Sequence, residues 1–157
     1  MNGLLFYGLL INKNYAAVKR LVRLGANPLK PKKDGITWLH VAATNNDVHT
    51  LDYLWSKIPQ KLINIPNNEG WTPAHFAAFL GNYDSLNLLI EHQWDLWIKH
   101  SHQMNAFEEI VRSNDDKLLE CVYDIYKTKP RDLNEEGGFS LVHLAAGTDA
   151  FRILKFL

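Results

Sequence analysis

Apolar residues recur along this chain at the spacing of short amphipathic helices, and the pattern repeats at a nearly constant interval. One set lies at positions 51, 54 and 55, a second at 86, 89 and 90, and a third at 119, 122 and 123. A shift of 35 residues (86 − 51) carries the first set onto the second, and a shift of 33 (119 − 86) carries the second onto the third. Such a period predicts a stack of repeated helical units rather than one irregular core.

A second landmark keeps the same register. Segments 37–43, 72–78 and 140–146 read TWLHVAA, TPAHFAA and SLVHLAA. The first two start 35 residues apart (72 − 37) and the last two 68 apart (140 − 72), which leaves room for one degenerate copy that starts near Asn105. Thr or Ser can cap a helix, Pro is tolerated in a first helical turn, and paired Ala residues let two helices approach closely.

These segments resemble the T-P-L-H-x-A signature of the ankyrin-repeat family, whose period is about 33 residues. The resemblance covers the whole chain and implies an all-α solenoid of stacked helix-turn-helix units with β-hairpin loops. Gly35, Gly70 and Gly138 lie two residues before the signature, where the hairpin turn of the family is expected to need a positive φ.

The register predicts one ankyrin-repeat domain over 1–157, with nine or ten helices in units at about 3–33, 34–68, 69–102, 103–137 and 138–157. The first unit lacks a hairpin, and the fourth has Asn105 and Glu108 where Thr and His are expected, which predicts an irregular hairpin and cap. Pro59, in the extra segment 56–61, should end a helix and lengthen a loop. The apolar end at Leu157 lacks a polar cap and suggests truncation, with more repeats or another domain beyond it.

Composition gives little support to nucleic-acid or membrane binding. The 17 basic residues balance 17 acidic ones, and no apolar run approaches the length of a membrane helix. The single cysteine, Cys121, fits a reducing compartment, so we expect an intracellular, cytoplasmic protein. Ankyrin repeats also occur in effectors that bacterial pathogens send into host cells, and the Asn- and Lys-rich composition is compatible with that origin and a host-cytosol location.

No pattern of titratable residues indicates catalysis. His40, His75 and His143 occupy one repeat position, so the stack should hold them too far apart to share a metal ion. His100 and His102 lack a third ligand nearby, and the Glu108–Glu109 and Asp115–Asp116 pairs are expected on solvated faces. We therefore predict no enzyme activity, cofactor, metal or small-molecule substrate.

The resemblance implies that a protein partner binds the concave side, made by the hairpins and the first helices. Positions just before the signature are all apolar, and the first-helix positions add two apolar residues and one arginine: Ile36, Trp71, Met104 and Phe139, then Phe79, Leu80 and Arg112. An exposed apolar stripe would mark an interaction site, centred on Trp71, Phe79 and Leu80. Alternatively, these side chains fold down between the hairpins and extend the core. Trp94 and Trp97 are expected to wedge between loops.

The sequence thus predicts a protein–protein interaction module. The alternative is a substrate-recruiting or spacer region of a larger protein, such as a secreted bacterial effector, with its enzymatic domain outside this chain.

Overall fold

The computed structural model describes residues 8, 12–113, 115, 117, 118 and 120. These residues form short α-helices joined by loops, with one 3-10 helix and an isolated antiparallel bridge between Lys99 and Asn105 in place of any strand. The helices are α2 (Tyr15–Arg23), α3 (Trp38–Thr44), α4 (Val48–Trp55), α5 (Pro73–Phe79), α6 (Tyr83–Glu91) and α7 (Ala106–Ser113), with the 3-10 helix at Gln60–Leu62. The predicted all-α repeat architecture is confirmed.

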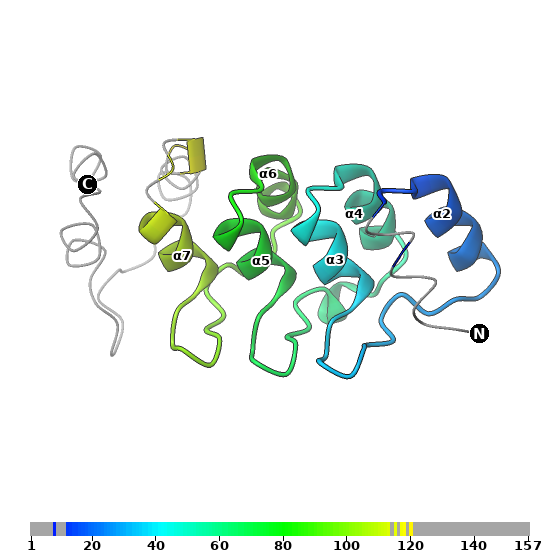
Figure 1. The fold of residues 1–157 in the computed structure, drawn as a ribbon, viewed down its shortest axis with the longest axis horizontal. Coiled ribbons are helices and arrows are strands. Elements are labelled where there is room, and N and C mark those ends of the chain that lie inside the picture. Colours follow the sequence, from blue (N-terminus) through cyan, green and yellow to red (C-terminus); the bar gives the residue numbers. More distant parts are fainter. Residues whose placement is uncertain (1–7, 9–11, 114, 116, 119, 121–157) are drawn as a thin grey trace.

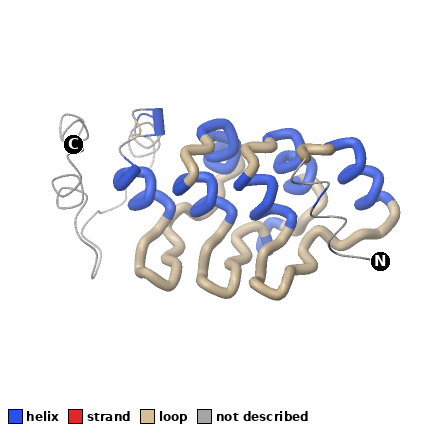
Figure 2. The backbone as a smooth tube through the Cα atoms, in the orientation of Figure 1, coloured by secondary structure: helices blue, strands red, loops and turns tan. Residues whose placement is uncertain are grey.

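The helices form two rows along one axis (Figure 1). The first helices of successive units, α3, α5 and α7, pack side by side, and the second helices α2, α4 and α6 form the other row. The loops between units all project to the same side of the stack, as the tube drawing in Figure 2 also shows. Each unit contacts mainly its neighbours, so the core runs along the stack rather than around one centre.

The turn between the two helices of a unit needs a left-handed residue. Asn46 has φ 52° between α3 and α4, and Gly81 has φ 68° between α5 and α6. These turns also join the units, because the side chain of Asn82 donates to the carbonyls of Ala43 and Thr44, both at 2.8 Å. Pro59 lies after the end of α4 and caps the 3-10 helix, which confirms the predicted loop extension.

Three hairpins share one set of backbone bonds. The amides of Lys32, Asn67 and His100 donate to the carbonyls four residues later, at 2.9, 2.8 and 3.0 Å. The left-handed position of the turn holds Gly35 and Gly70, each at φ 84°, which confirms the predicted role of these two glycines. The fourth unit places Gln103 there at φ 63°, so its hairpin is regular and the expected irregularity is wrong.

Neighbouring hairpins touch through their backbones. The amide of Asn68 donates to the carbonyl of Asp34, and that of Ser101 donates to the carbonyl of Glu69. A Cβ atom added to Gly70 would lie 2.9 Å from the Cα of His100. The glycine therefore serves both the turn and the close approach of the next hairpin.

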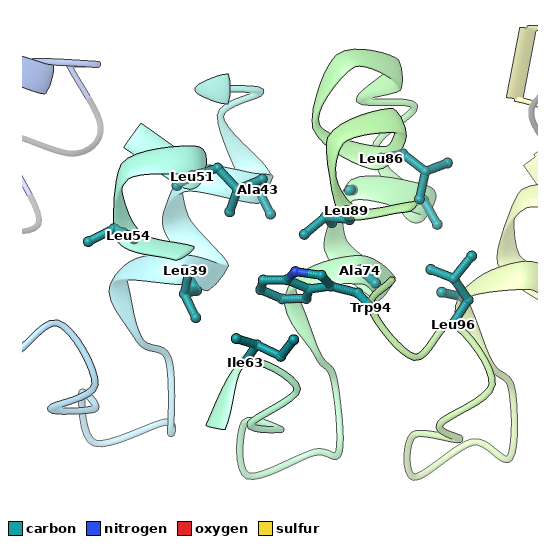
Figure 3. Packing of buried hydrophobic residues seen from close by; sticks show 14 of the residues in the cluster. Leu39, Ala43, Leu51, Leu54, Ile63, Ala74, Leu86, Leu89, Trp94 and Leu96 are labelled. Carbon is teal, nitrogen blue, oxygen red and sulfur yellow. The ribbon is translucent and has the colours of Figure 1, made fainter. Parts of the chain in front are cut away.

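The core is made by the residues that the periodic pattern selected. The Ala pairs at 42–43 and 77–78 are fully buried, and they belong to the same buried cluster as the second-helix leucines Leu51, Leu54, Leu86 and Leu89, which Figure 3 labels. Trp94 is buried, and Figure 3 shows its indole between Leu89, Leu39 and Ile63. It therefore packs against helices of two units as well as a loop, and not between loops alone as expected. Trp97 stacks on Phe107 at 4.9 Å between ring centroids.

The predicted unit boundaries stay a prediction, and part of them falls outside the described residues. The first helix of unit one, most of the second half of unit four and all of unit five lie outside them, with Cys121, Gly138, Phe139 and His143.

Candidate partner-binding face

Two buried histidines hold the start of a first helix in each of two units. In unit two, Nδ1 of His40 lies 3.1 Å from the amide nitrogen of Thr37 and 2.8 Å from its hydroxyl oxygen. Nε2 lies 2.9 Å from the carbonyl oxygen of Trp71 in the next unit. Because Nδ1 accepts the amide proton, the ring proton must sit on Nε2, which donates to Trp71. The ring therefore caps its own helix and tethers the following hairpin.

His75 repeats this arrangement one unit later. Nδ1 lies 3.1 Å from the amide nitrogen of Thr72, and Nε2 lies 3.2 Å from the carbonyl oxygen of Met104. The first of these contacts lies within its own unit, and the second crosses to the next unit. Both carbonyls belong to residues of the predicted apolar stripe, so the histidines fix the backbone that carries its side chains.

Burial keeps both rings neutral. It lowers the pKa of His40 from the ordinary value near 6.5 to about 4, against the opposing effects of the Trp71 carbonyl and the charge of Asp34. Burial, and to a smaller extent the nearby His100, likewise lower the pKa of His75 to about 4. A neutral ring is the form that the two hydrogen bonds require, because Nδ1 must accept.

Trp71 is half-buried rather than exposed. Its indole stacks on the ring of His100 at 4.7 Å and 12°, and the ring of Phe79 meets it edge-on at 5.4 Å. Its Nε1 is buried without a hydrogen-bond partner among the described residues. The expectation of a solvent-facing Trp71 at the centre of the stripe therefore needs correction, because neighbouring rings from its own and the next unit cover it.

Among the other pre-signature positions and Arg112, two are half-buried like Trp71 and one is exposed. Ile36 and Met104 are half-buried, and Arg112 is exposed with its Nη1 lying 3.6 Å from the sulfur of Met104. Phe139 lies outside the described residues. The alternative in which pre-signature side chains extend the core fits the described positions better than a fully exposed stripe.

The exposed apolar residues lie at the end of α5 and the start of α6. Phe79 is 59% exposed, Leu80 47% and Tyr83 39%. We call these three residues the apolar patch. Phe79 and Leu80 were predicted from the family positions, whereas Tyr83 was not, although its place just after the turn between the two helices of unit three was a usable signal. Leu24 is exposed too, but it belongs to unit one.

The fourth unit caps its helix with a different pair. Oδ1 of Asn105 accepts from the amide of Glu108 at 2.8 Å, and Oε2 of Glu108 accepts from the amide of Asn105 at 2.8 Å. This reciprocal pair is a complete capping box, so the expectation of an irregular cap is wrong.

Glu109 is buried rather than solvated. Its Oε1 lies 3.2 Å from Nε2 of His100, and both side chains are almost fully buried. Nδ1 of His100 accepts from the amide of His102, so the ring donates from Nε2 to the carboxylate. The expectation of a solvated Glu108–Glu109 pair is therefore wrong. His100 occupies the hairpin position of Asn67, whose side chain likewise accepts amide protons, and this equivalence could have indicated its role.

The described part of the chain holds no group of three or more His, Cys, Asp or Glu side chains that could bind a metal ion. Within the same part, no helix has the length and apolar character needed to cross a membrane.

Sequence comparison agrees with this geometry. Residues 6–100, more than half of the chain, match the family model for ankyrin repeats in three copies. The chain belongs to the ankyrin-repeat family. Ankyrin repeats are in general protein-interaction modules.

Three relatives illustrate the range of proteins that carry similar repeats. An ankyrin repeat protein of fowlpox virus is 29% identical over 157 residues, which cover 92% of this chain and 45% of the viral protein. The NAD-dependent deacetylase sir2B of Dictyostelium discoideum is 29% identical over 123 residues, 78% of this chain and 15% of the deacetylase. The RelA-associated inhibitor of Mus musculus is 31% identical over 75 residues, 48% of this chain and 9% of the inhibitor. The chain thus spans less than half the length of each.

Proposed function

We propose that this chain binds a protein partner on the side formed by the hairpins and the first helices, with the apolar patch as the anchor. The observation that carries the proposal is the exposure of Phe79 and Leu80, at 59% and 47%, in a unit whose other apolar side chains are largely covered. Large exposed apolar side chains commonly mark interaction sites.

The surroundings of the patch suit a rigid docking site. Trp71 backs Phe79 from the core side, and the preceding His40 holds the Trp71 backbone. A preorganised anchor loses little conformational entropy on binding. Ile36, Met104, Arg112 and Phe139 complete the proposed site, with Arg112 as a rim charge.

The test is capture of partners from cell lysate, followed by affinity measurement with the captured protein. Phe79→Ala/Leu80→Ala should weaken binding by roughly thirtyfold or more, since truncated hot-spot side chains commonly cost about 2 kcal/mol. Leu24→Ala is the control, because it removes another exposed leucine, 72% exposed, from a different unit. Arg112→Ala should weaken binding less and act mainly on its salt dependence.

The opposite pattern would refute the proposal. If Leu24→Ala or Arg112→Ala abolished binding while the double variant bound normally, the partner would dock elsewhere. A photo-crosslinking residue at position 80 should label the partner, whereas one at position 24 should not. Trp71→Ala does not separate the cases, because its ring also packs on His100.

A second candidate function is recruitment of a substrate within a larger protein. The deacetylase relative favours it, since the segment similar to this chain covers only 15% of a protein named as an enzyme. An immunoblot of the native protein would distinguish the two: a product much larger than 18.1 kDa supports recruitment, and one near that size contradicts it. In both candidate functions, the proposed role of the repeats is binding, and we propose that they catalyse no reaction themselves.

We also propose that the protein is intracellular and cytoplasmic. If it is a secreted effector, the proposed location is the cytosol of the host cell. Fractionation and imaging of the tagged protein would test it.

A further inference from the structure

The charges of this neutral protein are distributed very unevenly. Residues 1–33 hold seven of the 17 basic residues and no acidic residue, so the remaining chain holds 10 basic residues (17 − 7) and all 17 acidic ones. Six of the seven cations are exposed in the structure. We call these six the basic end: Lys13, Arg20, Arg23, Lys30, Lys32 and Lys33.

The basic end follows the first unit from helix to hairpin. Arg20 and Arg23 lie on the exposed side of α2, in its last turn, and the chain then runs along the end of the stack to the lysines of the first hairpin (Figure 1). Among the described residues, no carboxylate forms an ion pair with Lys13, Arg20 or Arg23.

Capping the stack does not explain why all the charges from Lys13 to Lys33 are positive, while Asp34, in the same hairpin, is the first exposed carboxylate of the chain. A terminal unit needs a polar outer face, which mixed charges supply equally well. Like charges three or four residues apart on a helix destabilise it by a few tenths of a kcal/mol, as with Lys19, Arg20 and Arg23. The helix dipole favours cations in the last turn of α2, but it does not act on the three lysines of the hairpin.

We propose that the basic end is a second interaction surface, which binds an acidic segment of a partner protein. The proposal is independent of the apolar patch, which lies two units away on different helices. Clustered charge of one sign attracts a segment of opposite sign and speeds its association.

Two other anionic partners fit the surface less well. The apolar side of α2 is committed to the core, with Val18 buried and Leu21 packed against it, so the helix cannot insert into a membrane surface. Binding of single-stranded nucleic acid usually employs exposed aromatic rings. Tyr15, the aromatic residue of α2, is half-buried and packs edge-on against Tyr53 at 5.8 Å.

The test measures, by fluorescence anisotropy, the binding of a fluorescein-labelled, glutamate-rich peptide. The full chain should bind it with an affinity that falls as salt rises, and should not bind the same peptide with glutamine in place of glutamate. Arg20→Glu/Arg23→Glu should weaken binding roughly tenfold. Lys61→Glu/Lys99→Glu, the matched control, makes the same change in net charge at exposed sites of units two and three and should have little effect.

Three results would overturn the proposal. They are equal loss in the two double variants, failure to prefer the glutamate peptide over the glutamine peptide, and tighter binding of oligouridine or phosphatidylserine vesicles than of the acidic peptide. Phe79→Ala/Leu80→Ala must retain the peptide, and loss in that variant would place the peptide on the apolar patch instead. Circular dichroism of each variant confirms folding.

Discussion

Units two and three begin their first helices with a threonine and a histidine, whereas unit four uses Asn105 and Glu108. Both pairs satisfy the amide at the start of the helix, at 3.1 Å for His75 and 2.8 Å for Glu108. Only the histidine has a second nitrogen, and that nitrogen donates to the carbonyl of Met104 in the next unit. A carboxylate has no proton to give, so the substitution keeps the cap and loses the tether.

The hairpins of units three and four also share one backbone conformation but differ in the residue that adopts it. Gly70 permits a left-handed turn and leaves space for the backbone of His100, while Gln103 takes the same turn with a side chain. A regular backbone can thus be built from different residues, at a different cost in free energy. The predictions below measure these differences, from the largest effect to the smallest.

Removing a histidine should cost more than removing its counterpart in unit four. His75→Ala leaves the Thr72 amide and the Met104 carbonyl without their partner and opens a cavity, so the free energy of unfolding should fall by about 3 kcal/mol. Glu108→Ala removes only a cap and should cost about 1 kcal/mol. Urea denaturation of both variants checks this, and equal losses would show that the tether contributes nothing. Affinity for a captured partner should be unchanged in the folded fraction of His75→Ala.

Acid should destabilise units two and three through the same rings. In the folded state the pKa of His40 and the pKa of His75 are both about 4, below the ordinary value of 6.5. As pH falls, these two rings are therefore protonated in the unfolded chain before they are protonated in the folded one. Their stabilisation is complete above about pH 6.5 and is lost as pH falls toward about 4. Each should lose about 2 kcal/mol between roughly pH 7 and pH 5.

Denaturation curves at several pH values would measure this loss. His75→Gln should give a shallower pH dependence than the wild type, because one of the two titrating rings is gone. The same dependence in both proteins would contradict the assignment of a low folded-state pKa to His75.

At the left-handed position of the hairpin, replacing glycine should lower the stability of unit three, and introducing glycine should raise the stability of unit four. Gly70→Ala forces a side chain into a left-handed turn and against His100, so stability should fall by about 2 kcal/mol. Gln103→Gly relieves a strained backbone and should raise stability by up to about 1 kcal/mol. Thermal unfolding of the two variants provides the measurement, and a loss of stability in Gln103→Gly would show that its side chain contributes contacts that outweigh the strain.

The smallest effect on stability is expected at the exposed end of α5. Phe79 occupies the family position that Arg112 holds in unit four, and both side chains are exposed. Phe79→Ala should change the free energy of unfolding by about 0.5 kcal/mol or less, because the side chain is exposed and the ring contact that it loses is the edge contact with Trp71. Chemical denaturation beside Arg112→Ala checks this, and a loss near that of His75→Ala would make Phe79 a core residue.

Much of the fold follows from local pattern. The periodic leucines, the Ala pairs and the signature residues correctly predicted the helices and the core of units two and three, because helix capping and apolar spacing depend on residues close in sequence. The same holds for Gly35 and Gly70, whose turns need a positive φ whatever the neighbouring unit does.

The candidate site was predicted less well. Phe79 and Leu80 are exposed as expected, but Trp71 is covered by His100, which lies 29 residues later in the chain (100 − 71), and Glu109 is buried against the same ring. Neither contact leaves a periodic signal, since each joins single residues of adjacent units.

The sequence by itself therefore determined the repeat, its register and the residues that each unit buries against its own helices. Only the tertiary structure decided which apolar side chains reach solvent, which acidic side chain is buried and how the seven cations of unit one lie on the end of the stack. The physical reason is that helix capping and amphipathic spacing act within one unit, whereas exposure depends on the shape of the next unit packed against it.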